Sequence, residues 1–323
     1  MTIDVHTHII PPELPDFNGY PHLRHHTCGA DLVREDGTVF RKLKPNCYQT
    51  ADRLADCDRD GVTRQVLSPI PVFFGYSVSI NQCMEVTRYL NDHIAGLISE
   101  HPQRFEGLGT IPMQDAEAAC HELERCMNMG LRGVEIGSNI DGRNLNHPDF
   151  FPIFEHAAKL GAAIFVHPWN MMGQNEMRDY WLPWLVGMPS ESTRAICSMI
   201  FGGVFERLPS LRVLFAHGGG SFAFTHGRIA HGFDVRPDLC AVDNDKSPRA
   251  YVGRFFVDSL VHDERALRFL IDTLGIDTVC MGSDYPFVLG EHQPGKMVRE
   301  TSLLNDHERA AILEHNARRW LGN

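Results

Sequence analysis

The sequence predicts an α/β fold in which eight parallel strand–helix units close into one barrel over residues 1–323. Eight short apolar runs occur along the chain, and stretches with helical periodicity separate most of them. A chain of 323 residues suits such a barrel with insertions better than an open, doubly wound sheet. No G-x-G-x-x-G pattern follows the first run, which disfavours a dinucleotide-binding sheet. Together these observations predict a single (β/α)8 barrel of the TIM type.

The predicted strands and helices alternate along the chain. Thr50 is expected to cap a helix over 50–61, and Gly61 is expected to end it. In the helical stretch before the sixth strand, Ser190 is expected to act as the cap and Pro209 to close the helix. Further helices are expected at about 81–100, from near Asp115 and at 150–161. The eight strands are expected at 2–8, 64–69, 105–112, 132–138, 162–169, 211–220, 254–259 and 277–286.

Two stretches fit no strand–helix unit. The first, about 11–49, separates the first strand from its helix, and Asp36-Gly37 within it predicts a tight turn in a small β ribbon. The second, 170–189, follows the fifth strand. Both insertions begin at the carboxyl ends of strands, where barrel active sites are built. The histidines of the first insertion, His22, His25 and His26, are expected in a loop.

Composition limits the possible partners. The chain carries 41 acidic residues against 30 lysines and arginines, a formal net charge of -11. Such a surface repels phosphate backbones and anionic lipids, so neither nucleic acid nor a membrane is expected as a partner. The longest uncharged apolar window, 195–205, is too short to span a bilayer. Apolar residues make up 43% of the chain, which is enough for a large core.

The cysteines indicate a reducing compartment. There are nine, scattered and without a C-x-x-C pair, which suits free thiols buried as small apolar residues. The chain starts with strand-like sequence and shows no signal peptide. A cytoplasmic location is therefore expected.

The first strand carries an H-x-H pattern. Because side chains alternate along a strand, His6 and His8 should share the inner face of the barrel, with Asp4 one step deeper. Ile3 and Val5 should point outward to the covering helices. Two adjacent imidazoles can chelate a metal, but two hydrogen-bonded core histidines would give the same pattern. Asp4 is open to two interpretations, a partner of the ligands or a buried structural acid.

Other strand ends strengthen the metal hypothesis. The fifth, sixth and eighth apolar runs lead into His167, His217 and Asp284. Imidazoles and a carboxylate suit Zn²⁺ with one open coordination position, and other divalent ions of intermediate softness remain possible. His217 alone could be a ligand, an acid/base group or a plain residue before the glycine turn.

One absence predicts a single ion. Barrel hydrolases with two metals often bridge them by a modified lysine at the end of the fourth strand. Here that strand reads "GVEIGSN", which contains no lysine. The sequence therefore predicts one metal ion per subunit. The lysines of the chain are Lys42, Lys44, Lys159, Lys246 and Lys296, and none ends a predicted strand.

These motifs resemble the amidohydrolase superfamily. The resemblance rests on H-x-H in the first strand together with "FVHPW", "FAHGGGSFAF" and "GSDYPF". Further stretches are similar to its branch of metal-dependent decarboxylases that act on 2-amino-3-carboxymuconate-6-semialdehyde, and the likeness runs nearly end to end. These stretches are "YWLPWLVGMP" (180–189), "AICSMI" (195–200), "GGVFERLP" (202–209), "RIAHGF" (228–233) and "RPDLC" (236–240).

The resemblance implies roles for individual residues. It places the zinc ligands at His6, His8, His167 and Asp284. It implies that His217 is the acid/base group and that Asp284 and Arg41 also serve catalysis. Arg41 would bind a substrate carboxylate through its planar guanidinium, although beside Lys42 and Lys44 it would otherwise pass for a solvated charge. The implied substrate-binding residues are Arg41, Met171, Trp181, Phe287, Arg228 and Arg236.

The resemblance also implies a reaction and an assembly. The expected reaction is zinc-dependent, non-oxidative decarboxylation of a small dicarboxylate in the kynurenine route of tryptophan breakdown. The expected assembly is a homodimer, with Arg228 donated across the interface and Arg236 as a further candidate for that role. Two routes remain open: addition of water to the conjugated substrate, and direct delivery of a proton to the carbon that loses CO2.

Alternatives and departures remain. A hydrolase of a lactone or amide, or a decarboxylase of a related aromatic acid, would use similar residues, whereas a non-catalytic scaffold should have lost the polar strand ends. Asn170 stands where the branch usually has an acid, and 18–26 is shorter than in some relatives. Neither departure touches a predicted ligand.

Overall fold

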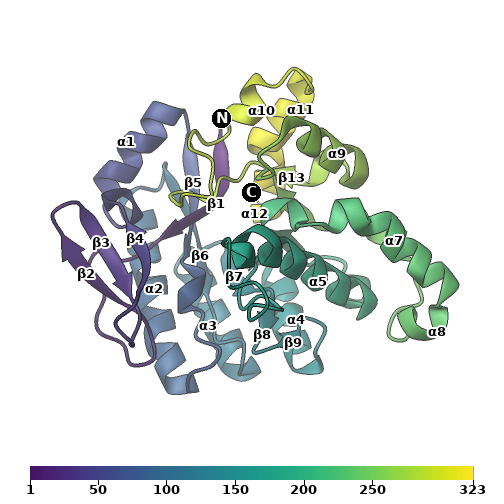
Figure 1. Ribbon diagram of the computed structural model, residues 1–323, viewed down its shortest axis with the longest axis horizontal. Helices are drawn as coiled ribbons and strands as arrows, with labels where there is room; N and C mark the ends of the chain where they lie inside the picture. Colours follow the sequence, from purple (N-terminus) through teal and green to yellow (C-terminus); the bar gives the residue numbers. More distant parts are fainter. Residues whose placement is uncertain (323) are drawn as a thin grey trace.

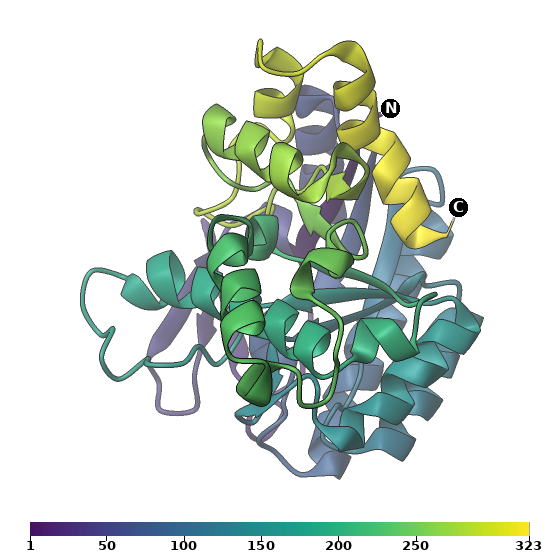
Figure 2. The same cartoon turned by 90° about the vertical axis from the view of Figure 1, so that its right-hand side faces the viewer.

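The barrel is present in the computed structural model, which describes residues 1–322. Eight parallel strands follow one another in the order β1-β5-β6-β7-β10-β11-β12-β13, and helices surround them (Figures 1 and 2). Backbone bonds from Val5 N to Met281 O and from His8 N to Tyr285 O join the last strand region to β1. The predicted (β/α)8 fold is thus confirmed. The barrel strands are β1 (Ile3–Ile9), β5 (Arg64–Pro69), β6 (Phe105–Thr110), β7 (Gly133–Gly137), β10 (Ala163–His167), β11 (Arg212–Phe215), β12 (Phe256–Asp258) and β13 (Val279–Cys280).

The helices fall close to their predicted places. They are α1 (Thr50–Asp60), α2 (Ile80–Glu100), α3 (Ala116–Asn128), α4 (Phe151–Leu160), α5 (Met188–Phe201), α6 (Val204–Arg207), α7 (Phe222–Val235), α8 (Pro237–Cys240), α9 (Glu264–Leu274), α10 (Lys296–Glu300), α11 (Asp306–Ala310) and α12 (Asn316–Leu321). π-Helical turns occupy Pro183–Gly187 and Ala311–His315. No helix within residues 1–322 is both long and apolar enough to cross a membrane.

Two predicted helix caps are wrong and one helix end is right. The N-cap of α1 is Gln49, so Thr50 is the first helical residue. Gly61 ends this helix in the left-handed conformation, with φ of 70°. Ser190 does not cap α5, because the π-helical turn runs directly into that helix and places Ser190 inside it. Its hydroxyl donates to the carbonyl of Val186 at 2.9 Å.

The first insertion forms a three-stranded antiparallel ribbon of β2 (His22–His26), β3 (Gly29–Val33) and β4 (Val39–Leu43). The predicted turn at Asp36-Gly37 is confirmed, since Asp36 Oδ1 accepts from Thr38 N at 2.9 Å. The loop expected around His22, His25 and His26 is wrong. Both edges of β3 are paired, and this pairing draws that segment into β2. A second small pair joins β8 (Asn139–Ile140) to β9 (Arg143–Asn144).

A bulge in β1 changes which side chains face the interior. Asp4 is opposite Gln65 while Thr7 is opposite Leu67, so Val5 and His6 share one position of the partner strand. The expectation that Ile3 and Val5 point outward is therefore wrong: both are buried in the central apolar cluster. Asp4 takes the other face. The remaining members of this cluster include Val66, Leu108, Ala163, Phe165, Leu214, Cys280 and Trp320.

Candidate metal centre

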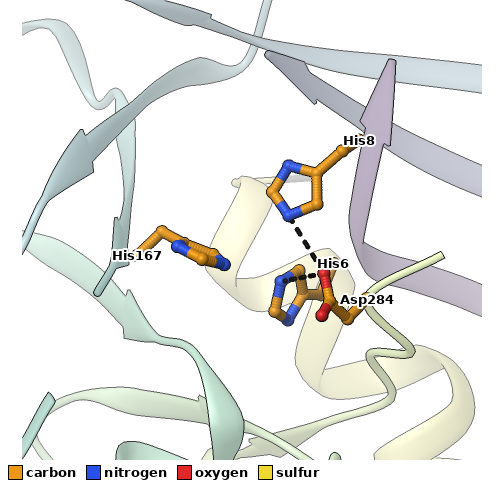
Figure 3. Close-up of side chains that lie close together, drawn as sticks. All are labelled: His6, His8, His167 and Asp284. Carbon is orange, nitrogen blue, oxygen red and sulfur yellow. Dashed lines mark ion pairs between the residues drawn. The ribbon is translucent and has the colours of Figure 1, made fainter. Parts of the chain in front are cut away.

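Four predicted ligands meet at the carboxyl ends of the strands. His6 and His8 come from β1, His167 ends β10, and Asp284 lies just after β13; all four are buried. Each offers one donor atom, and these atoms lie within 4.8 Å of one another. Figure 3 shows the four side chains converging on one point. The geometry is that of a small chelating cluster.

The donor atoms are free to bind a cation. His6 Nε2 and His8 Nε2 lie 3.4 Å and 3.2 Å from Asp284 Oδ1. Within residues 1–322, none of these three buried atoms makes a hydrogen bond of ordinary geometry. Unpaired buried polar atoms are costly, so their convergence fits a divalent ion with nitrogen and oxygen ligands.

The second ring nitrogen of each ligand histidine, Nδ1, has a hydrogen-bond partner of its own. His6 Nδ1 lies 2.7 Å from Asp258 Oδ2. His8 and His167 place Nδ1 2.9 Å and 3.0 Å from backbone carbonyl oxygens. Because these partners only accept hydrogen bonds, Nδ1 carries the proton and Nε2 presents a lone pair to the centre. Such contacts fix the ring orientation that a metal requires.

The charges also favour metal binding. Burial lowers the pKa of His8, and that of His167 well below its usual value, so both are neutral ligands near pH 7. Burial opposes protonation of His6, but Asp258 and the nearby carboxylates raise its pKa overall. Burial likewise opposes ionisation of Asp284, yet the surrounding imidazoles keep its pKa well below the usual range. The ionised carboxylate would supply one negative charge to the cation.

His217 stands beside this cluster. It follows β11, and its Nε2 lies 4.0 Å from Asp284 Oδ2. Burial and the neighbouring His6 lower the pKa of His217 to about 4. The ring is therefore neutral at pH 7 and able to accept a proton. It also lines a cavity of about 350 Å³ with Asp284 and apolar side chains that include Leu260 and Val261.

The ribbon delivers Arg41 to the mouth of the barrel. Its guanidinium carbon lies 3.9 Å from the ring centroid of Phe287, and both residues line a cavity shared with His167, Asp284 and Trp181. No ion pair or side-chain hydrogen bond of Arg41 occurs within residues 1–322. Burial lowers its pKa, but a guanidinium stays charged. The result is an unpaired cation facing the cluster.

Two other predicted substrate residues, Phe287 and Trp181, line the same cavity as Arg41 and stack on neighbouring rings. Phe287 stacks on His8, with ring centroids 5.3 Å apart, and Trp181 stacks on Trp184 at 5.9 Å. Met171 is buried against Gly187.

Two arginines that were predicted to bind substrate lie away from the metal cluster of their own chain. Arg228 is exposed on α7, the helix that extends away from the barrel in Figure 1. Arg236 pairs with Asp238 at 2.7 Å on the surface. Within one chain, neither arginine is placed at the cluster.

Sequence reasoning missed Asp258, although the same signal was available, because it ends the seventh apolar run. It also missed Glu135, which lies on the fourth barrel strand with Oε1 3.8 Å from His8 Nδ1. Burial raises the pKa of the Glu135 carboxyl well above its usual value. Asp4 accepts from Ser283 N at 3.1 Å and from the backbone N of His6 at 3.3 Å, so it supports the loop that carries Asp284 and the strand that carries His6.

Comparisons with known proteins identify the family of this chain. The family model described as amidohydrolase matches residues 3–322. A 2-amino-3-carboxymuconate-6-semialdehyde decarboxylase of Dictyostelium discoideum is 51% identical, covering 100% of this chain and 92% of the relative. One of Caenorhabditis elegans is 36% identical, covering 99% and 94%.

A solved structure is also similar in fold. The dihydroxybenzoic acid decarboxylase of a Polaromonas species, with bound manganese and the inhibitor 2-nitroresorcinol, superposes with a TM-score of 0.82. Its sequence is 20% identical, and the match covers 99% of this chain and 96% of that one. This likeness supports the barrel fold.

Proposed function

This chain belongs to the amidohydrolase family, in the branch of the 2-amino-3-carboxymuconate-6-semialdehyde decarboxylases, and we propose that it converts that semialdehyde to 2-aminomuconate-6-semialdehyde with loss of CO2. It is a metal-dependent decarboxylase, a carboxy-lyase. The observation that carries the specific reaction is the unpaired Arg41 facing four convergent donor atoms. The proposed setting is tryptophan breakdown by the kynurenine route, in the cytoplasm, and nine free thiols support a reducing compartment.

We propose one zinc ion per chain, held by His6, His8, His167 and Asp284. Bound there, the ion would supply Lewis-acid polarisation of substrate or water. The fourth barrel strand, Gly133–Gly137, contains no lysine that could bridge to a second ion. Three imidazoles and a carboxylate favour zinc, and manganese is the main competitor.

Arg41 would bind and orient a carboxylate of the substrate. Its guanidinium is already held over Phe287, so little side-chain freedom is lost on binding. Because Arg41 forms no ion pair within residues 1–322, the substrate would supply the counter-charge. We propose that Phe287, Trp181 and Met171 shape the apolar wall beside the conjugated chain.

His217 would move a proton at its Nε2. This nitrogen lies 4.0 Å from Asp284 Oδ2, so substrate or water at the cluster falls within its reach. The neutral ring can take a proton and return it to the carbon that loses CO2. Whether water first adds to the conjugated system is a separate choice that this placement permits.

We propose that the working unit is a homodimer. The side chains of α7 and its neighbourhood include exposed apolar groups, with Phe224 83% and Leu239 64% exposed. Such a surface fits a protein–protein contact. Arg228 and Arg236 on the same segment would then reach the partner's site and bind a second carboxylate.

A combined metal and product assay tests the proposal. Purified protein is analysed for zinc and manganese, then assayed spectrophotometrically on the muconate semialdehyde with and without chelator. We expect one ion per chain, activity that disappears with the ion, and one CO2 per substrate consumed. Two tightly bound ions would refute the single-ion proposal. A hydrolysed lactone or amide without CO2, or turnover confined to aromatic acids, would refute the proposed reaction.

A further inference from the structure

Asp258 lies at the junction of the metal cluster and the loop of His217. It ends β12, is fully buried, and accepts four hydrogen bonds. Its Oδ2 faces His6 Nδ1 at 2.7 Å and His217 N at 2.9 Å. Its Oδ1 faces Gly218 N at 2.8 Å and Leu260 N at 3.1 Å. All four partners must donate, because a carboxylate only accepts.

The first consequence concerns the tautomer of His6. A proton held on Nδ1 by Asp258 leaves Nε2 unprotonated, and Nε2 is the atom that lies 3.4 Å from Asp284 Oδ1. His8 and His167 use neutral carbonyl oxygens for the same purpose. His6 therefore has the strongest such anchor among the three imidazoles, since a charged acceptor forms the stronger bond.

The second consequence concerns the backbone at His217. His217 and Gly218 have φ of 57° and 61°, and the left-handed conformation is unfavourable for a histidine. This turn aims two successive N–H groups at one carboxylate. The two bonds from Asp258 offset that backbone cost and fix where the imidazole of His217 leaves the chain.

The surroundings leave the Asp258 carboxylate no alternative position. A Cβ at Gly282 would lie 2.7 Å from Asp258 Cβ and 2.9 Å from His6 Cβ, so the close approach depends on that glycine. Asp258 also pairs in register with Cys280 of β13. The side chain is thus held on both sides by the barrel wall.

We propose that Asp258 is a positioning residue that couples the metal ligand His6 to the acid/base group His217 through one carboxylate. It selects the nitrogen of His6 that faces the ion and sets the conformation of the turn that carries His217. The inference rests on the proposed function for the role of His217. Its part in metal binding does not require any particular substrate.

Asp258→Asn tests the coupling because it keeps the shape and removes the second acceptor. If the amide oxygen stays toward Gly218 and Leu260, the amide N–H groups face His6 and His217 N. His6 must then accept at Nδ1 and carry its proton on Nε2, which blocks the metal. We expect zinc affinity, measured by competition with a chromophoric chelator, to fall about 10- to 100-fold. At saturating zinc we expect kcat to fall at least about tenfold with KM little changed, because His217 is displaced.

A matched control separates positioning from general destabilisation. Asn244 is also buried, but its side-chain amide donates to Ile200 O and Tyr251 Oη, both at 2.8 Å, and neither partner belongs to the cluster. Asn244→Ala should lower thermal stability while leaving zinc affinity and kcat unchanged. Asp258→Asn with wild-type zinc affinity and kcat would overturn the proposal, as would equal losses in both variants.

A measurement on the wild type keeps the proposal testable even if Asp258→Asn does not fold. In zinc-loaded protein labelled with ¹⁵N-histidine, we expect the His6 proton on Nδ1, exchanging slowly. Zinc on Nδ1, or a proton on Nε2, would overturn the assignment. If zinc binds as expected but the muconate semialdehyde is not decarboxylated, the proposed function fails and the role of Asp258 in metal binding stands.

Discussion

Arg41→Met is the sharpest test of substrate recognition. The substitution keeps an unbranched side chain over Phe287 and removes the charge and the planar fork. Within residues 1–322 Arg41 has no ion pair, so only the bound substrate should lose a partner. We therefore expect activity and stability to respond differently.

The expected size follows from the contacts available. A guanidinium can form two hydrogen bonds to one carboxylate, and each bond to a charged group contributes about 1.5–3 kcal/mol. Allowing for water that replaces the lost bonds at the open mouth, we expect about 3 kcal/mol, or about 100-fold in kcat/KM. Arg41→Lys keeps the charge without the fork and should lose about tenfold. The free energy of unfolding should change by less than about 1 kcal/mol, the value of the cation–π contact with Phe287.

The assay compares kcat/KM on the muconate semialdehyde at equal metal content, with urea unfolding of each variant measured alongside. Arg41→Met with kcat/KM within about threefold of the wild type would refute the recognition argument. A loss of activity matched by a loss of zinc or of folded protein would also refute it, because within residues 1–322 Arg41 forms no ion pair or side-chain hydrogen bond with a ligand.

Three further predictions follow from the same structure. His217→Ala should lower kcat by about 10²–10⁴ with metal content unchanged, and near-wild-type turnover would exclude it as the acid/base group. Burial lowers the pKa of His93 to about 4, below the unfolded value of about 6.5, so its contribution to stability is present above pH 6.5 and lost as the pH falls toward 4. Between pH 7 and pH 5, urea unfolding of the wild type should therefore lose about 2 kcal/mol more than that of His93→Leu, and equal losses would contradict the sign. Phe224→Asp should shift the assembly toward monomer in light scattering, whereas the control Leu303→Asp should not. A wild-type protein that is already monomeric would refute the proposed homodimer.

Local pattern was enough for much of the fold and for the candidate ligands. The period-two alternation and the apolar runs located all eight barrel strands, since strand formation depends on neighbours along the chain. His167 and Asp284 could be identified because parallel strands bring their carboxyl ends to one face of the barrel. The same rule should have found Asp258, which ends β12.

The alternation of side chains along a strand could not predict the bulge in β1 or its effect on side-chain directions. The extra residue in β1 moves Ile3 and Val5 into the interior and Asp4 away from it, reversing three expected directions. A bulge depends on the register with the neighbouring strand, which no local pattern encodes. The third ribbon strand was missed for the same reason, since β2 forms by pairing with β3.

By itself, the sequence determined the barrel, the metal-binding residue types and the resemblance to a decarboxylase branch. The tertiary structure decided how those residues act together. It placed Arg41, from an insertion, over Phe287 with no ion-pair partner in the described part of the chain, and it joined His6 to Asp258 across 252 residues. Contacts of this kind depend on chain closure, so spacing along the sequence carries no signal for them. The donor atoms of the cluster were therefore predictable, and the groups that aim them were not.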